Sequence, residues 1–548
     1  MKLYILSFNI LSEIENRLQV NDSLYFIEGY LSFIPRKQFK KEIRYNKSEF
    51  YSHCKRIMRY LYVQGRKKDE GYNKLKIFEL ELNLYLLLFI KNYFFLKNIR
   101  EHDIYIIDDN SLEIRVIKDV LKYQNINFSE IKFQDDSKNI SGKLKELITG
   151  LIYFLKRLNN IFISTKELIY LETTSHPLME KVFLHLLKNT KESIVVGNKH
   201  KGLFKYIFNP RVFLAPKTKN KEEPKYFIPK LDEEVIEGID IREVILRYLE
   251  GVKINPKLML KINSYLSPNK MNIKSAVFLF DRYPNQKLLI ENFQKHNIPV
   301  YMIQHGIYGE LEPPIEADYF FIWGDYMEKL LRSYRNEKLQ TIKTGNYLYK
   351  NYLEKKKEIL SAKERFEKMY KIKLDKKVMV FVTQPNDNGF LDNDTYENLI
   401  PLLSEMKNYM DDWNLIIKIH PREDEKIYSR ILNSLGLSKK VILTRWFNPY
   451  ELLTFSDRIV FMYSTMGLDG IAFDKEVILI NLTQFTDPIN FSAYNCFFPV
   501  NDANSLKRIF SKEPLNISKE EKERFLIDFM SKIDNNGIEI ICNEISKT

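Results

Sequence analysis

Several side chains that can bind an anion or move a proton come directly after apolar, β-branched runs of the chain. In "NLIIKIHPRED", His420, Pro421 and Arg422 follow such a run. A histidine at the end of a buried strand can donate a hydrogen bond to a phosphate, and a proline after it fixes the turn. A structural histidine explains an isolated His-Pro pair equally well, so the chemistry depends on what lies beside it.

A second run, "DRIVFMYS", ends in Ser464, and Thr465 follows before a helix-like pattern begins. Hydroxyl groups and backbone N–H groups at a helix N-terminus together form an anion site that suits a phosphate. Ordinary N-capping uses the same residue types and is the alternative interpretation.

Three more polar residues of the second half fall near the same predicted edge. In "RWFNPYELL", Glu451 could hold ribose hydroxyls, with a solvated helix glutamate as the alternative. In "VTQPNDNGF", Thr383 and Gln384 offer neutral donors, although Pro, Asn and Gly there also fit a simple turn.

In the first half, "YIIDDNS" ends its apolar run in Asp108 and Asp109. Neighbouring carboxylates raise the pKa of one another, so one of them can serve as a general base for a sugar hydroxyl. Turn and capping roles are the alternative for both residues. His305, in "QHG" after another apolar run, is open to the same two interpretations.

The elements that position these residues are short β-branched and aromatic runs alternating with longer amphipathic segments. This pattern predicts α/β units with parallel strands. The predicted strands are 2–7, 23–29, 103–109, 193–198, 275–281, 299–305, 319–324 and 341–346, then 377–384, 414–420, 441–444, 458–464 and 477–482. A charged helical connector is expected over 347–374, and a loop over 199–230.

Ligands of parallel α/β sheets lie beyond the carboxyl ends of the strands, where the candidate residues occur. The sequence predicts two Rossmann-like domains. They are an acceptor-binding domain over 1–350 and a nucleotide-sugar-binding domain over 351–515, followed by a helical tail over 516–548.

Composition limits the function classes. The 548 residues carry a net charge of +13, spread along the chain, and only three cysteines, without metal-ligand or disulfide-framework spacing. Nucleic acid is disfavoured because no binding signature appears, which leaves phosphorylated substrates or peripheral contact with an anionic membrane. The apolar window 82–96 is too short to span a bilayer and predicts a buried or membrane-touching helix. We expect a cytoplasmic protein whose first residues form a strand rather than a signal peptide.

The motifs "DDNS" (108–111), "HPR" (420–422) and "YST" (463–465) together resemble those of bacterial GT-B sialyltransferases and related capsule polysaccharide transferases that use CMP-activated sugars. The resemblance implies two Rossmann-like domains facing a central cleft. It implies Asp109 as the base, His420 with Ser464 and Thr465 at the CMP phosphate, and Glu451 at the ribose. Asn110 replaces the motif glycine, and Arg422 stands where many members have lysine.

The predicted activity is inverting transfer of a sialic-acid or Kdo-type sugar from a CMP donor to a glycan or glycolipid acceptor of capsule or lipopolysaccharide. No cofactor or metal is expected, because a helix dipole with cations can neutralise the leaving phosphate. The second half is also similar to UDP-sugar 2-epimerases and polyol-phosphate polymerases. A UDP-sugar epimerase, a UDP-sugar or CDP-polyol transferase, and a non-catalytic capsule-assembly scaffold are therefore the alternatives.

Overall fold

The structure of the 548-residue chain is a computed structural model. The residues that it describes are 2–6, 23–26, 85, 89, 93, 103–108, 112–132, 167–172, 176–197, 209–214, 235–236, 239–251, 272–279, 281, 284–308, 315–334, 339–346, 359–384, 395–421, 423, 425–462, 464–481, 489, 491–510, 517–531 and 536–547.

The second half is built on a six-stranded parallel sheet in the order β16-β15-β14-β17-β18-β19. Its strands are β14 (Lys377–Val382), β15 (Trp413–Lys418), β16 (Val441–Thr444), β17 (Arg458–Phe461), β18 (Glu476–Ile480) and β19 (Phe498–Val500). The helices are α13 (Ile359–Tyr370), α14 (Thr395–Met406), α15 (Glu425–Ser434), α16 (Pro449–Phe455), α17 (Thr465–Ala472) and α18 (Ala503–Phe510), with short 3-10 turns at Lys407–Tyr409 and Phe491–Ala493.

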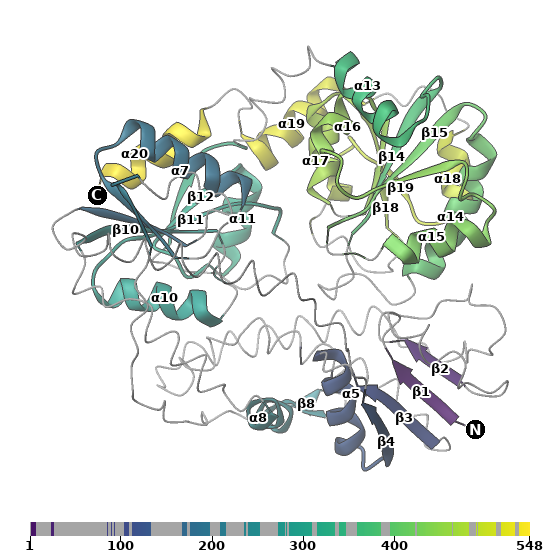
Figure 1. Ribbon diagram of the computed structural model, residues 1–548, viewed down its shortest axis with the longest axis horizontal. Coiled ribbons are helices and arrows are strands. Elements are labelled where there is room, and N and C mark those ends of the chain that lie inside the picture. The colour runs from purple at the N-terminus through teal and green to yellow at the C-terminus, as the bar shows by residue number, and fades with distance from the viewer. Residues whose placement is uncertain are drawn as a thin grey trace.

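Both faces of this sheet are buried, as Figure 1 shows for the helices around it. Met379 and Phe381 of β14 pack with α14, α15 and α18, whereas Val378, Val380 and Val382 pack with α13, α16 and α17. Side chains alternate between the faces of a strand, so a strand covered on both faces must be apolar throughout. This requirement explains the unbroken apolar run "VMVFV" of β14.

A seven-stranded parallel sheet carries the middle of the chain, in the order β13-β12-β11-β10-β5-β6-β7. Helices α10 and α11 share one of its core clusters, and α7 shares the other. The bounds are β5 (Leu168–Leu171), α7 (Pro177–Asn189), β6 (Ser193–Val196), β7 (Val212–Leu214), β10 (Ile273–Phe278), α10 (Pro284–Lys295), β11 (Val300–Ile303), β12 (Tyr319–Ile322), α11 (Asp325–Tyr334) and β13 (Gln340–Lys343).

A smaller four-stranded parallel sheet, β2-β1-β3-β4, contains the N-terminal strands. Its elements are β1 (Lys2–Leu6), β2 (Ser23–Phe26), β3 (Asp103–Asp108), α5 (Leu112–Tyr123) and β4 (Phe128–Lys132), and a separate antiparallel pair, β8 (Val235–Ile236) and β9 (Ile239–Asp240), precedes α8 (Ile241–Gly251). The strands predicted within 1–350 therefore belong to two parallel sheets rather than one, and the domain boundaries stay a prediction.

The apolar window 82–96 contributes three described residues, all helical and spaced by four. Tyr85 and Phe89 are buried; the Tyr85 hydroxyl donates to Asp119 of α5 at 2.7 Å, and Phe89 and Tyr93 meet the ring of Tyr123 edge-on. These three residues thus pack against α5 inside the protein. Across the described ranges, none of the helices combines the length and apolar character needed to cross a membrane.

The α/β class with two large parallel sheets, which the sequence predicted, is confirmed, and the four-stranded parallel sheet is additional to them. Every predicted strand is present, usually shortened by one to three residues at an end. Six strands were missed: β4, β5, β7, β19 and the two-residue strands β8 and β9. The expected loop over 199–230 is wrong at its centre, because β7 lies there and pairs with β6. The connector is helical from Ile359 to Tyr370.

The C-terminal helices α19 (Lys519–Met530) and α20 (Gly537–Lys547) bind both large sheets together. Phe529 of α19 belongs to the core under the six-stranded sheet and also stacks on Tyr326 of α11, with ring centroids 4.4 Å apart. Helix α20 lies on α7, and the Ser275 hydroxyl donates to the Ile545 carbonyl at 3.4 Å. The segment after 516 is thus part of both cores.

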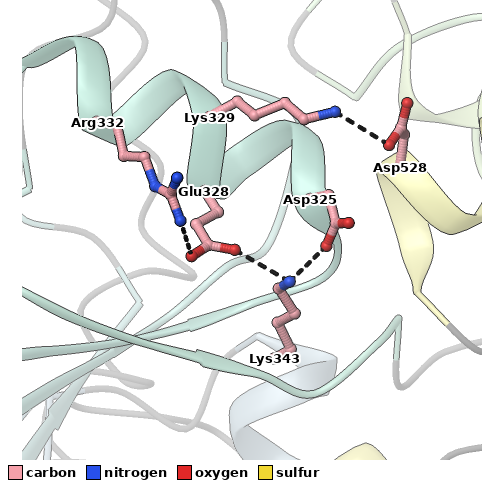
Figure 2. A network of polar contacts seen from close by, with 6 residues as sticks. All are labelled: Asp325, Glu328, Lys329, Arg332, Lys343 and Asp528. Carbon is pink, nitrogen blue, oxygen red and sulfur yellow. Dashed lines mark hydrogen bonds and ion pairs between the residues drawn. The ribbon is translucent and has the colours of Figure 1, made fainter.

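Gly324, which follows β12, allows α19 to approach the seven-stranded sheet. A Cβ at this position would lie 2.4 Å from the Asp528 carbonyl oxygen, closer than any side-chain carbon can approach it. Figure 2 shows the ion pairs around this junction. Lys329 reaches Asp528 at 3.4 Å, and Lys343 bonds Asp325 at 2.6 Å. Hydrogen bonds to Asp325 and Glu328 raise the pKa of Lys343, although exposed pairs of this kind contribute little to stability.

Candidate functional site

The strand order identifies where each sheet can bind a ligand. In an open parallel sheet, a crevice forms at the carboxyl ends where connections on the two sides run in opposite directions. In the six-stranded sheet this point lies between β14 and β17. Thr383 follows β14, and Ser464 follows β17 at the start of α17. The sequence-predicted residues therefore flank the topological switch point of this sheet.

The same rule applies to the other two sheets. The switch point of the seven-stranded sheet lies between β5 and β10, and that of the four-stranded sheet between β1 and β3. Asp108 is the last residue of β3 and thus lies at that second point. Asp109 and Arg422 lie outside the described residues, as do the side-chain contacts of Asp108.

The turn after β15 is held by one buried carboxyl group, that of Glu423. Its Oε2 accepts hydrogen bonds from the Thr383 hydroxyl and from the His420 backbone N–H, the latter at 3.2 Å. Its Oε1 accepts a hydrogen bond from the Tyr428 hydroxyl at 2.6 Å. Thr383 Oγ1 also accepts from the His420 N–H at 2.9 Å. Glu423 therefore ties the ends of β14 and β15 to α15.

This network fixes where the turn 420–421 lies. It uses the backbone of His420, and the half-buried imidazole extends from a backbone that cannot shift freely. Thr383 is fully buried within the network, while Pro421 is exposed and Gln384 half-buried. Sequence reasoning missed Glu423, although it belongs to the same "HPRED" segment, because a charged residue there suggests a solvated loop.

Ser464 is the N-cap of α17. Its backbone is extended, with φ −83° and ψ 144°, and its Oγ accepts from the Met466 N–H at 3.3 Å. A capping hydroxyl keeps its own hydrogen, so it can still donate to a ligand. Gly467, in the first turn, allows close packing, because a Cβ there would lie 2.2 Å from the Phe461 ring. The first turn of α17 thus sits directly on the end of β17, with Thr465 half-buried.

Glu451 lies in the first turn of α16. Asn448 caps this helix through Oδ1, which accepts from the Tyr450 N–H at 2.9 Å. The Glu451 carboxylate pairs with Arg365 of α13 at 3.2 Å, and its side chain is 23% exposed. The carboxylate therefore has a partner and an open side, and its predicted bond to ribose stays a prediction.

Two cations lie beneath and beside the His420 turn. Lys418, at the end of β15, is buried, and its Nζ donates to the Arg445 carbonyl at 2.6 Å. The Arg445 guanidinium donates to the Pro421 carbonyl. Burial, with a smaller contribution from Arg445, lowers the pKa of Lys418 to about 8. The edge of the sheet is thus electropositive next to the predicted phosphate site.

The lowered pKa of Lys418 predicts a pH-dependent stability. The folded state binds this proton less tightly than the unfolded chain, so stability rises as the pH increases from about 8 toward 10.5. We expect the free energy of unfolding of the parent, minus that of Lys418→Met, to increase by about 2 to 3 kcal/mol over this window. Denaturant unfolding of both proteins across the window measures it. A difference that stays constant would show that Lys418 is not buried as a cation.

His305 follows β11 in the seven-stranded sheet, beside a clamp that joins β11 to β12. Gln304 Oε1 accepts from the Trp323 backbone N–H at 2.7 Å, and Trp323 Nε1 donates to the Gln304 carbonyl at 3.1 Å. Gln304 Nε2 also donates to the Gly306 carbonyl at 2.9 Å. The clamp explains why "QHG" and "IWG" end neighbouring strands: together they hold His305 at the carboxyl edge.

His176, which sequence reasoning missed, lies near His305. The two rings meet edge-on with centroids 6.1 Å apart. His176 caps α7, and its Nδ1 accepts from the Leu178 N–H at 3.3 Å. Nδ1 therefore carries no proton, Nε2 is the donor, and burial lowers the pKa. A sequence signal for His176 exists: "SHP" (175–177) is another His-Pro pair like that of His420 and Pro421, and it follows the missed strand β5.

The structure thus brings Thr383 and His420 into one network and places Ser464 and Thr465 across the switch point from Thr383. Glu451 lies on α16, which precedes β17 of the same sheet. His305 belongs to the seven-stranded sheet and Asp108 to the four-stranded one.

Comparison with known proteins gives one family match. Residues 325–486 match the model of a family described as "Capsule polysaccharide biosynthesis protein". This region runs from the start of α11 through β18 and includes His420, Glu451 and Ser464. A search of the curated proteins finds no match to the chain.

Three solved structures show how far the likeness in shape extends. Wall teichoic acid polymerase TagF, soaked with CDPG, is 12% identical with a TM-score of 0.41, over 74% of this chain and 95% of its own. UDP-GlcNAc 2-epimerase from Neisseria meningitidis, bound to UDP-GlcNAc, is 15% identical with a TM-score of 0.44, over 70% and 100%. MnaA from S. aureus, with UDP, is 15% identical with a TM-score of 0.44, over 70% and 96%.

Proposed function

We propose that the chain is an inverting glycosyltransferase of capsule polysaccharide biosynthesis that moves a sialic-acid or Kdo-type sugar from a CMP donor to a surface glycan or glycolipid. The observation that carries the proposal is the fixed His420 turn beside the switch point of the six-stranded sheet. The family match over 325–486 supports the pathway, since it covers this same region.

In the proposed reaction, the acceptor oxygen bonds to the anomeric carbon while the bond from that carbon to the CMP phosphate oxygen breaks. The leaving phosphate gains negative charge as the bond breaks. His420, the Ser464 and Thr465 hydroxyls and the N-terminus of α17 would stabilise this charge, with the Lys418 and Arg445 cations close by. Hydrogen-bond donors that are already fixed need no reorganisation during the reaction. In this proposal, the Glu423 network serves to hold His420 in place before the donor binds.

The acceptor hydroxyl loses its proton in the same step. We assign this proton to Asp109, which follows β3 at the switch point of the four-stranded sheet. His305, at the edge of the seven-stranded sheet, is the competing base. The assignment of Glu451 to the ribose, and of Thr383, Gln384, Pro421 and Arg422 to the nucleotide, belongs to the same proposal. The net charge of +13 suits peripheral contact with an anionic membrane, where a glycolipid acceptor would be presented.

Calorimetric titration with CMP, CDP and UDP tests the proposed donor. We expect CMP to bind and UDP to bind at least 10-fold more weakly, because a site built for a CMP-sugar holds one phosphate and a cytosine. Tighter binding of UDP would favour a UDP-sugar epimerase or transferase, and tighter binding of CDP a polyol-phosphate transferase. Binding of none of the three would favour a non-catalytic scaffold.

The phosphate site has its own prediction. Ser464→Ala combined with Thr465→Ala removes two hydroxyl donors and should weaken CMP binding by about 2 to 6 kcal/mol, at about 1 to 3 kcal/mol per bond to a phosphate. The control is Ser505→Ala, at the start of a helix away from the switch point, whose hydroxyl serves backbone groups at 501 and 502. Unchanged CMP affinity in the double variant would remove α17 from the phosphate site.

A further inference from the structure

An exposed tryptophan lies beside the His420 turn, and the proposed function gives it no role. Trp446 is 79% exposed, whereas the other two tryptophans of the chain, Trp323 and Trp413, are 3% and 5% exposed. Single exposed apolar side chains are common on protein surfaces, so exposure alone does not indicate a site. The surroundings of this ring do.

The strand register places Trp446 level with His420. Lys418 of β15 pairs with Thr444 of β16. His420 lies two positions after Lys418, and Trp446 lies two positions after Thr444. Adjacent strands lie about 4.8 Å apart, so the two chain segments leave the sheet side by side. Trp446 is therefore at the same carboxyl edge as the proposed phosphate site, displaced from the switch point toward the edge of the sheet.

One side of the indole is occupied by Arg445. Its guanidinium carbon lies 5.3 Å from the ring centroid, and the same guanidinium donates to the Pro421 carbonyl. A cation over the face of an indole is attracted by the ring quadrupole. Arg445 thus connects Trp446 to the turn 420–421. The rest of the indole surface accounts for the 79% exposure of this residue.

The same loop leads to the residue assigned to the ribose. Asn448, two positions after Trp446, caps α16, and Glu451 lies in the first turn of that helix. A nucleotide with its phosphate at the switch point and its ribose at Glu451 would project its base along this loop. Aromatic side chains bind bases by stacking, and every base has a π face to offer.

From these positions we propose that Trp446 is the stacking platform for the base of the nucleotide donor, with Arg445 fixing the ring against the His420 turn. The ligand class is a pyrimidine nucleotide, and the inference rests on the proposed function. Stacking recognises the base and not the sugar phosphate, so the contribution of Trp446 can be separated from that of the phosphate site.

The experiment uses the full chain, with Trp446→Ala and Trp446→Phe as variants and CMP and ribose 5-phosphate as probes. Binding is measured by calorimetry and by tryptophan fluorescence. The exposed side chain can be replaced without disturbing the core, and the two buried tryptophans provide a constant background. We expect CMP to quench the fluorescence of the parent. Trp446→Ala should weaken CMP binding by about 5- to 100-fold, the range that loss of one base–aromatic stack produces.

Two further results would separate stacking from a general disturbance of the loop. Ribose 5-phosphate, which lacks the base, should bind Trp446→Ala as it binds the parent. Trp446→Phe should restore most of the CMP affinity while abolishing the fluorescence change. Parent-like CMP affinity of Trp446→Ala, or an equal loss for both probes, would overturn the inference while leaving the proposed function intact. If the parent itself does not bind CMP, the proposed function fails and the platform with it.

Discussion

Asp109→Asn is expected to lower the rate of sugar transfer by about 100-fold or more while leaving CMP affinity unchanged. Asparagine keeps the size of the side chain and most of its hydrogen bonds, but it cannot take up the proton of the sugar acceptor's hydroxyl. A positioned general base raises the reaction rate by about 100- to 10,000-fold. Donor binding should not change, because the proposed nucleotide site belongs to the six-stranded sheet and Asp109 follows β3 of another sheet. Release of CMP from a CMP-sugar in the presence of a capsular oligosaccharide measures the rate.

Asp108→Asn is the matched control, since Asp108 ends β3 and its neighbour carries the proposed role. The effect of this control should be several-fold at most. The competing base is His305, and His305→Gln keeps a polar side chain without a titratable ring. If Asp109→Asn transfers sugar at close to the parent rate while His305→Gln is inactive, the base lies in the loop after β11. The four-stranded sheet would then have no assigned role in the chemistry.

Glu423→Ala should give the largest change in stability. The substitution removes the acceptor that Glu423 offers to the hydroxyls of Thr383 and Tyr428 and to the backbone N–H of His420, and of these three groups the N–H keeps Thr383 Oγ1 as a second acceptor. Hydrogen bonds to a charged group contribute about 1.5 to 3 kcal/mol each, and a buried donor left unpaired adds a desolvation cost. Water can enter the gap and replace some of the lost hydrogen bonds. We therefore expect the free energy of unfolding to fall by about 3 to 5 kcal/mol, as measured by denaturant unfolding.

Two comparisons show whether the network causes this loss. Tyr428→Phe removes one of the three donors and should cost about 1 to 2 kcal/mol. Glu425→Ala, at an exposed position two residues away, should change stability by less than about 0.5 kcal/mol. A loss below about 1 kcal/mol for Glu423→Ala would mean that other contacts hold the His420 turn. CMP binding would then have no reason to depend on Glu423.

The parallel strands were predictable because burial on both faces forces a continuous apolar run. β14, β15 and β17 are such runs, and their ends gave Thr383, His420 and Ser464 directly. β5 was missed because "LIYL" is four residues long, and a short apolar run does not distinguish a strand from part of a helix. Since β5 lies at the switch point of its sheet, losing it also concealed His176.

Side-chain hydrogen bonds between neighbouring strands were not predictable from the amino-acid sequence. Glu423 is buried because Thr383, 40 positions earlier in the chain, supplies a hydroxyl to it, and no local pattern records that pairing. The clamp between Gln304 and Trp323 likewise depends on β11 and β12 being neighbours. The capping role of Ser464 was predictable, and its proposed anion-binding role stays a prediction that uses the same hydroxyl and the same helix end.

The proposed function depends most on where the nucleotide phosphate binds, and a crystal structure with CMP tests this directly. We predict the phosphate between the ends of β14 and β17, within hydrogen-bonding distance of the Ser464 hydroxyl and the His420 ring. A phosphate bound instead between the ends of β5 and β10, beside His176 and His305, would contradict the account. It would assign the nucleotide to the seven-stranded sheet and leave the Glu423 network with a purely structural role.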